Sequence, residues 1–132
     1  MRLIFLGPPG IGKGTQAKLI SKKFSLTHLS TGDMFRSHIN QETEVGLLAK
    51  SYIDKGKLVP DSVVLEMVKD RLGTSDTSGG FIFDGFPRTK VQSLALDKFL
   101  KSFDLFINQV ISLVGEDAIL VERVSSRRTC SE

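Results

Sequence analysis

The sequence of 132 residues is 40% hydrophobic and 25% charged, which predicts one folded domain with its own core rather than a disordered chain. Its formal net charge of +3 comes from scattered basic residues, which suits small anionic ligands and gives no indication of nucleic acid as a partner. The lack of a long apolar run, of a signal-peptide pattern and of any cysteine besides Cys130 predicts a cytoplasmic protein that does not enter a membrane.

The first two predicted elements are a strand and a helix. The apolar run LIFL at residues 3–6, which ends at a glycine, predicts a central strand buried on both faces. Residues 13–24 carry apolar side chains three and four positions apart, at Ala17, Ile20 and Phe24, which predicts an amphipathic helix. A strand, a glycine-rich loop and a helix in this order form the first half of a βαβ unit.

The loop between these elements reads GPPGIGKGT at residues 7–15. Gly7, Gly12 and Lys13 match the phosphate-binding pattern G-x-x-x-x-G-K. The glycines let backbone N–H groups curl around phosphate oxygens, the helix N-terminus adds partial positive charge, and the lysine reaches the terminal phosphates. A dinucleotide loop, G-x-G-x-x-G, does not fit because Thr15 occupies the third glycine position. The segment predicts a nucleotide site, and its position between strand and helix disfavours a plain turn.

Three helices are predicted for the next part of the chain. Ser30 and Asp33 have capping-box spacing and open the first. The second spans about residues 44–55 and stops at Gly56. The third starts with Asp61 as N-cap and ends at Gly73. Its predicted inward positions are Val64, Met67, Val68 and Leu72.

The second half of the chain alternates strands with helices. FIF at residues 81–83 predicts a second buried strand, and a third is expected within residues 105–113. Helices are expected over about residues 90–101 and 116–127, the last with Leu120, Val121 and Val124 inward. This order predicts an α/β protein with a P-loop NTPase three-layer sandwich, in which helices cover both faces of a central parallel sheet. Since no element near residue 132 would close the core, we expect the fold to be incomplete at its C-terminus.

Five segments together resemble the nucleoside monophosphate kinases, and adenylate kinase above all. They are GPPGIGKGTQA at 7–17, LSTGDMFR at 29–36, DKGKLVPD at 54–61, DGFPRTKVQ at 84–92 and the arginine pair at 127–128. Gly14 directly follows the lysine, where the general motif has Ser or Thr. The form GKGT at residues 12–15 is therefore more restricted than the general motif. The resemblance covers essentially the whole chain. It implies a monomer with a nucleotide-binding core (1–29 and 60–127), an AMP-binding insertion (30–59) and the start of a lid domain (128–132).

The same resemblance implies the reaction ATP + AMP = 2 ADP, with Mg²⁺ accompanying ATP. The catalytic groups would be Lys13, Arg88, Arg123 and Arg127. ATP would contact Gly7, Pro8, Pro9, Gly10, Ile11, Gly12, Lys13, Gly14, Thr15, Arg123 and Arg127. Asp84 and Asp33 would hold Mg²⁺ through water. The residues alone leave other roles open: Asp84 as a turn former, Asp33 as a capping acid, and the two late arginines as a solvated helix end.

AMP would contact Thr31, Gly32, Arg36, Lys57, Leu58, Val59, Gly85, Phe86, Arg88 and Gln92. Taken alone, Thr31 and Arg36 equally suit a helix cap and a solvated arginine. The alternative functions are a UMP/CMP-type kinase and a non-catalytic nucleotide-binding module. Related UMP/CMP kinases usually read SAGD where this sequence reads STGD, and carry Asn at the position of Gln92. Both positions therefore favour AMP.

Full-length members of the family continue into a lid and further core elements, so we expect this chain to be a fragment with little activity. Cys130 stands where some relatives carry the first cysteine of a zinc site in the lid, and a tetrahedral site needs about four ligands. Structural Zn²⁺ is thus expected only with a complete lid. His28 and His38 receive no role and no predicted partner, with His38 on an exposed helix face.

Overall fold

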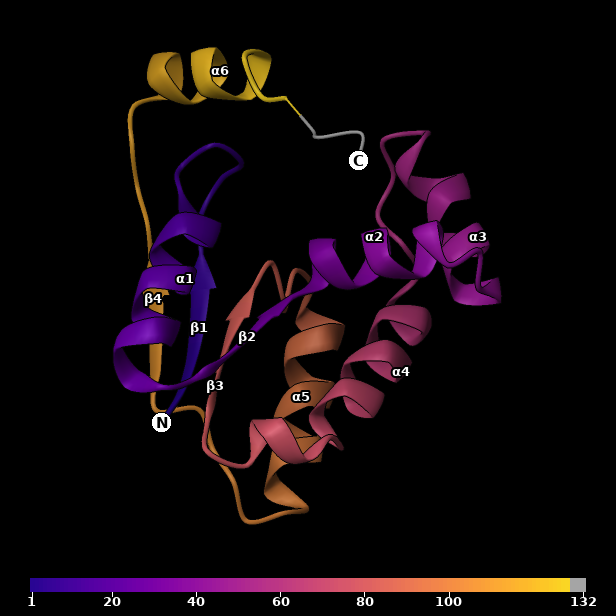
Figure 1. The fold of residues 1–132 in the computed structure, drawn as a ribbon, viewed down its shortest axis with the longest axis vertical. Helices are drawn as coiled ribbons and strands as arrows, with labels where there is room; N and C mark the ends of the chain where they lie inside the picture. Colours follow the sequence, from indigo (N-terminus) through magenta and orange to yellow (C-terminus); the bar gives the residue numbers. More distant parts are fainter. Residues whose placement is uncertain (129–132) are drawn as a thin grey trace.

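Four strands form one parallel sheet in the computed structural model, which describes residues 1–128 (Figure 1). They are β1 (Arg2–Leu6), β2 (Thr27–Ser30), β3 (Phe81–Asp84) and β4 (Gln109–Ser112). Their order across the sheet is β2-β3-β1-β4, so β1 pairs with β3 on one side and with β4 on the other. The predicted α/β architecture with a central parallel sheet is confirmed.

Six α-helices and a short 3₁₀ helix connect and cover the strands. They are α1 (Lys13–Phe24), α2 (Thr31–Asn40), α3 (Glu44–Ile53), α4 (Asp61–Leu72), η1 (Ser75–Thr77), α5 (Lys90–Lys101) and α6 (Asp117–Ser125). Among these described elements, none is long and apolar enough to span a bilayer. The predictions for residues 129–132, Cys130 included, lie outside the described residues.

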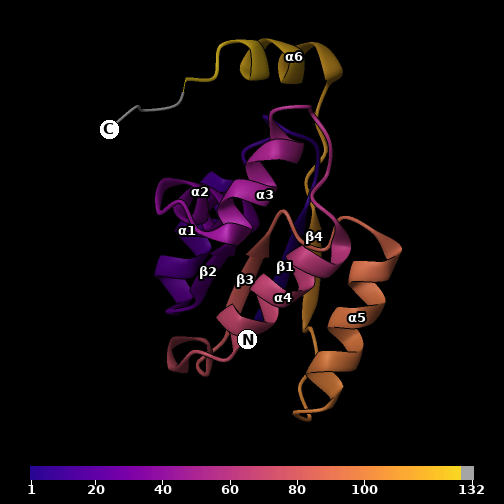
Figure 2. The ribbon, with the colours of Figure 1, turned by 90° about the vertical axis from the view of Figure 1, so that its right-hand side faces the viewer.

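The two faces of the sheet bury different side chains because neighbouring strand residues point to opposite sides. Leu3, Phe5 and Ile82 pack with Ala17 of α1. Ile4, Phe81 and Phe83 pack on the other face, in the larger cluster that contains α4 and α5. Figure 2 shows α1 and α5 on opposite sides of the strands. The predicted three-layer arrangement is therefore present, and it aligns the carboxyl ends of all four strands along one edge.

Several local predictions were wrong or incomplete. Only three strands were expected; β2 adds a fourth, and the apolar run 105–113 contributes only β4. Phe24 is 50% exposed because the sheet covers α1 on the side of Ala17. In α6, Leu120 is buried but Val121 and Val124 are largely exposed, because this helix lies across the phosphate loop rather than on a sheet face.

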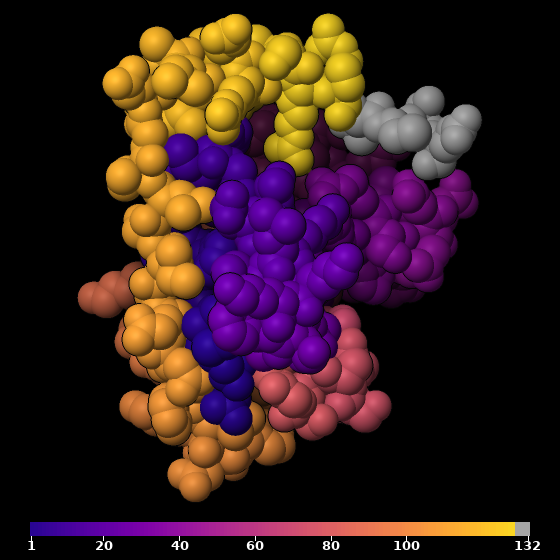
Figure 3. Space-filling model, turned by 60° about the vertical axis from the view of Figure 1, so that its left-hand side comes forward, coloured from indigo at the N-terminus to yellow at the C-terminus, as the bar shows by residue number. Residues whose placement is uncertain are grey.

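Figure 3 shows α6, in yellow, at one end of the molecule beside the indigo N-terminal segment. Arg123 Nη1 of this helix donates a hydrogen bond to the carbonyl oxygen of Gly10 at 3.4 Å. A Cβ placed on Gly10 would lie 3.0 Å from Val124 Cγ2, so the helix and the loop are in van der Waals contact. The helix thus forms one wall above the loop.

The predicted start of α4 also needs correction. Pro60, not Asp61, occupies the N-cap, and it supplies no side-chain cap. Asp61 is the first helical residue, and its carboxylate accepts hydrogen bonds from Thr89 and Gln92 of the distant α5 region. The carboxylate therefore joins two elements instead of capping its own helix.

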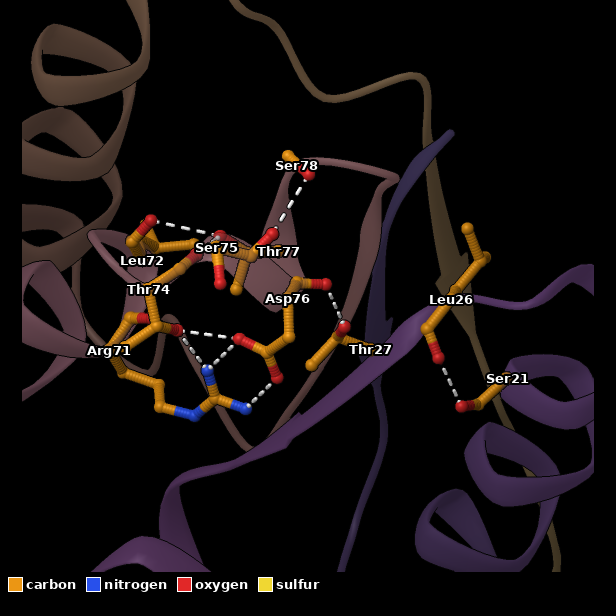
Figure 4. A network of polar contacts seen from close by, with 10 residues as sticks. All are labelled: Ser21, Leu26, Thr27, Arg71, Leu72, Thr74, Ser75, Asp76, Thr77 and Ser78. Atoms are coloured by element: carbon orange, nitrogen blue, oxygen red, sulfur yellow. Dashed lines mark hydrogen bonds and ion pairs between the residues drawn. The ribbon is translucent and has the colours of Figure 1, made fainter.

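A polar network ties the end of α4 to β2 at the opposite end of the sheet from the loop (Figure 4). Arg71 donates two hydrogen bonds to the two carboxylate oxygens of Asp76, each at 2.7 Å. The Thr27 hydroxyl donates to the backbone oxygen of Asp76. Hydrogen bonds from Arg71 and Thr74 hold the pKa of the Asp76 carboxyl far below its usual range. This network fixes the loop between α4 and β3.

Candidate functional site

The phosphate loop follows β1 directly and wraps around the ammonium group of Lys13. The backbone has φ of +82° at Gly10 and +96° at Gly12, values that side chains with a Cβ rarely adopt. Lys13 Nζ donates to the carbonyl oxygens of Gly7 and Pro8 at 2.8 and 2.9 Å. The lysine predicted to meet phosphate therefore lies inside its own loop, at the N-terminus of α1.

A cavity of about 580 Å³ opens in front of this loop. Its wall combines loop residues with basic side chains from α1, α2, α6 and the segments that follow β3 and α6: Lys13, Lys18, Arg36, Arg88, Arg123 and Arg127. Burial lowers the pKa of Lys13; Asp84 works against this, and Arg88 and Arg127 add to it. So many cations around two carboxylates, Asp33 and Asp84, make a site for a polyanion.

Not every predicted ATP contact borders this cavity. Pro9, Gly10, Gly12, Gly14 and Thr15 do, whereas Gly7, Pro8 and Ile11 belong to the loop but not to the cavity wall. Ile11 faces the segment before α6, where a Cβ on Gly115 would lie 2.6 Å from Ile11 Cδ1. The Ile11 side chain therefore packs the loop against the segment that precedes α6.

Asp84 ends β3 beside the loop. A Cβ on Gly14 would lie 3.2 Å from Asp84 Oδ2, so the small residue after Lys13 makes room for the carboxylate. His28 Nε2 lies 3.4 Å from the same oxygen, without hydrogen-bond geometry, and has no hydrogen-bond partner among the described residues. Sequence analysis gave His28 no role, because its position depends on the pairing of β2 with β3. His38 does have a partner, the Thr43 hydroxyl, 3.0 Å from its Nδ1.

Asp33 and Arg36 form an ion pair on the exposed side of α2, next to the larger cavity. Partial burial works to raise the pKa of the Asp33 carboxyl, but Arg36, the Ser30 hydroxyl and Lys18 together hold it below its usual range. Ser30 caps α2 as predicted, since its hydroxyl accepts from the Asp33 N–H at 3.2 Å. Asp33 therefore stays ionised and faces the anion site together with Arg36.

These carboxylates suit Mg²⁺ bound through water. Within residues 1–128, no group of three or more His, Cys, Asp and Glu side chains could hold a metal ion by itself. Mg²⁺ keeps several waters and binds through one or two carboxylates plus substrate phosphates. Asp84 and Asp33 both line the larger cavity, so their oxygen ligands fit such an ion.

A second cavity, of about 270 Å³, lies between α2, the segment after α3, and α5. Nine of the ten residues predicted to contact AMP line it: Thr31, Gly32, Arg36, Lys57, Leu58, Val59, Gly85, Arg88 and Gln92. Phe86 does not; its ring is buried in the core against Phe83, with ring centroids 5.1 Å apart. Sequence analysis missed the apolar part of the wall, made by Phe35, Ile39, Ile53 and Val64. Helical spacing from Thr31 could have indicated Phe35.

Polar side chains converge at the inner end of this smaller cavity. The Thr31 hydroxyl and Arg88 Nε both donate to the carbonyl oxygen of Gly85, at 3.0 and 2.8 Å. Gln92 is 3% exposed, and its Oε1 accepts from the backbone N–H of Arg88 at 2.7 Å. The cavity thus combines an apolar slot, an oriented amide and two guanidinium groups, a combination suited to a flat heterocycle with an anionic group.

Comparison with known proteins identifies the family of the chain. A family model described as adenylate kinase matches residues 5–129. The adenylate kinases of Clostridium tetani (strain Massachusetts / E88) and Alkaliphilus oremlandii (strain OhILAs) are 52% and 54% identical to this chain over 132 residues, all of the chain and 61% of each relative. That of Caldicellulosiruptor bescii is 53% identical over 130 residues, 98% of the chain and 60% of the relative. The chain therefore spans about 61% of the length of curated relatives that it matches. Because the family model matches nearly all of it, the chain belongs to the adenylate kinase family.

Proposed function

We propose that this chain is the nucleotide-binding part of an adenylate kinase, which catalyses ATP + AMP = 2 ADP. One observation carries the proposal: the two cavities share a wall. Gly32, Arg36, Gly85 and Arg88 line both of them. Two nucleotides bound in the two cavities would bring their phosphate groups together at the guanidinium groups of Arg36 and Arg88.

In this proposal residues 30–59 are the AMP-binding insertion, and residues 1–29 and 60–127 are the core. AMP occupies the smaller cavity, and the ATP phosphates lie on the loop ahead of α1. An oxygen of the AMP phosphate attacks the γ-phosphorus in line, forming a new P–O bond as the bond to the β–γ bridging oxygen breaks. The products are two molecules of ADP, and no covalent enzyme intermediate is needed.

The protein's contribution to this reaction is charge and position. Lys13, Arg88, Arg123 and Arg127 neutralise charge on the phosphoryl group as it passes between the nucleotides. Asp84 and Asp33 would hold Mg²⁺ through water, and the ion would supply further charge neutralisation. Arg123 and Arg127 are exposed on and beyond α6, so water reaches this end of the site. Since phosphoryl transfer depends on closure around the substrates, we expect slow turnover from this 132-residue chain.

Thr31 and Gln92 support AMP, rather than UMP or CMP, as the acceptor, as the sequence analysis indicated. Both side chains border the smaller cavity and are buried, so they can distinguish bases by hydrogen bonds formed away from water. A monomeric, cytoplasmic protein, with structural Zn²⁺ only in a complete lid, stays our prediction.

Binding and turnover measurements with the 132-residue chain test the proposal. Calorimetry should find AMP bound at least about tenfold more tightly than CMP or UMP, the ratio expected from one well-made polar contact. A coupled assay should detect slow ADP formation. Lys13→Ala should weaken ATP binding at least about tenfold and abolish turnover, because it removes the charge inside the loop. Lys22→Ala, which removes an exposed lysine of the same helix, is the matched control.

Each alternative function predicts a different result. Tighter binding of CMP or UMP than of AMP would identify a sibling kinase. Binding of ATP and AMP without ADP formation above the Lys13→Ala background would identify a nucleotide-binding module instead of an enzyme.

A further inference from the structure

Asp61 forms a contact that its place in the sequence does not suggest. It is the first residue of α4, and its Oδ1 accepts a hydrogen bond from Gln92 Nε2 at 2.8 Å and another from the Thr89 hydroxyl at 3.1 Å. Thr89 is the N-cap of α5, and its hydroxyl also accepts from the Gln92 N–H at 3.2 Å. The Asp61 carboxylate, just after the 30–59 segment, therefore holds the side chain of Gln92, which lines the smaller cavity.

The hydrogen bonds of Gln92 define which end of its amide is nitrogen. Ionised Asp61 can only accept, so the amide group facing it must be the NH₂ donor. The Arg88 backbone N–H, 2.7 Å from the other end, can only donate, so the atom there must be the carbonyl oxygen. A flipped amide would set oxygen against carboxylate and NH₂ against N–H, at a side chain that is 3% exposed. Asp61 and Arg88 thus favour a single orientation of the amide.

This orientation leaves one N–H and one oxygen lone pair of Gln92 for a ligand in the cavity. The Watson–Crick edge of adenine offers an acceptor at N1 and a donor at N6, which complement that pair. The same edge of hypoxanthine is reversed, with a donor at N1 and an acceptor at O6. An amide that can turn would accommodate either base, whereas a fixed amide accommodates one.

We propose that Asp61 is a specificity-determining positioning residue: its carboxylate fixes the Gln92 amide in the orientation that accepts adenine and rejects hypoxanthine. The proposal rests on the proposed function, because it requires the smaller cavity to bind a purine monophosphate. It assigns Asp61 an effect on the choice of base without direct contact with the base.

The test is calorimetric titration of the 132-residue chain with AMP and with IMP, two nucleotides that differ at the purine 6-position and N1. Asp61→Asn keeps the shape of the side chain but can donate as well as accept, so the amide of Gln92 is no longer fixed from this side. We expect the ratio of the IMP Kd to the AMP Kd to fall about tenfold, which corresponds to the loss of one hydrogen bond to a charged group. Asp70→Asn, at an exposed position of the same helix, should leave the ratio within twofold of wild type.

The ratio separates positioning from simple destabilisation, since a merely structural role would weaken AMP and IMP binding together. A fall of less than threefold in Asp61→Asn, or an equal fall in Asp70→Asn, overturns the proposal. Asp61→Ser decides in the same way if Asp61→Asn does not fold, and failure of both to fold would make Asp61 structural and overturn it too. A wild-type chain that does not prefer AMP to IMP also overturns the proposal, because a fixed amide should bind only one of the two bases well. A chain that binds neither nucleotide contradicts the proposed function itself, which is a different failure.

Discussion

Replacing Gly46 with alanine should force α2 and α3 apart. A Cβ at this position would lie 2.1 Å from the carbonyl oxygen of His38, 2.3 Å from its carbonyl carbon and 2.7 Å from the backbone nitrogen of Ile39. Ordinary contacts begin at 3.4 Å, so the helices must separate by about 1 Å. All three atoms belong to the backbone of α2, and no rotamer change can relieve the clash.

The expected cost follows from two opposing effects. Overpacking of this kind costs about 1–3 kcal/mol, while alanine in a helix interior gains about 0.5–1 kcal/mol over glycine. Because the clash is with backbone atoms, the overpacking cost should be near its upper limit, and the net loss in the free energy of unfolding should be about 2 kcal/mol. Since α2 carries Thr31, Phe35 and Arg36, its displacement should also weaken AMP binding several-fold. ATP binding should weaken less, because the phosphate loop lies outside α2.

Urea denaturation and calorimetry of the variant would measure both effects. Gly79→Ala is the matched control, because a Cβ there has no atom of the described chain within 4 Å. If Gly46→Ala were as stable as the wild type and bound AMP equally well, the close approach of the two helices would not exist in solution.

Two further predictions concern the larger cavity and the polar network. Gly14→Ala should place a methyl group 3.2 Å from Asp84 Oδ2, so the carboxylate must move by a few tenths of an ångström. The dependence of ATP binding on Mg²⁺ should therefore decrease while the melting temperature changes little. Calorimetry with and without Mg²⁺ checks this, and unchanged Mg²⁺ dependence would count against the role of Asp84. In the folded protein the pKa of the Asp76 carboxyl is depressed. The hydrogen bonds of the Asp76 carboxylate therefore stabilise the fold fully above the ordinary pKa of about 3.9, and this stabilisation decreases as the pH falls below that value. The urea midpoint of the wild type should therefore decrease more between pH 6 and pH 3 than that of Asp76→Asn; parallel decreases would contradict the linkage.

The sequence predicted those features that depend on neighbouring residues. An apolar run, a glycine-rich loop and a lysine at the start of a helix are local patterns, so β1, the loop and α1 could be located without coordinates. The order of elements was enough for the α/β class, because strands that alternate with helices must cross over in parallel.

Features that depend on register or on distant contacts could not be predicted in this way. His28 meets Asp84 because β2 pairs with β3, and Asp61 meets Gln92 because α4 and α5 begin side by side. The exposure of Val121 and Val124 has a similar origin: amphipathic spacing assumes a sheet beneath the helix, whereas α6 crosses a loop. The apolar wall of the smaller cavity was missed because Val64 was predicted to face the core and Phe35 was given no role.

The hydrogen bonds from Lys13 to Gly7 and Pro8 determine at which step the loop loses its conformational entropy. They close residues 7–13 into a ring through the ammonium group, so the loop is ordered by its own lysine. The conformational entropy of the loop is then lost when the protein folds, and little of it remains to be lost when a nucleotide binds. Phosphate oxygens compete with two carbonyl oxygens for the same three ammonium protons. Binding at this loop is therefore an exchange of partners within a preformed ring.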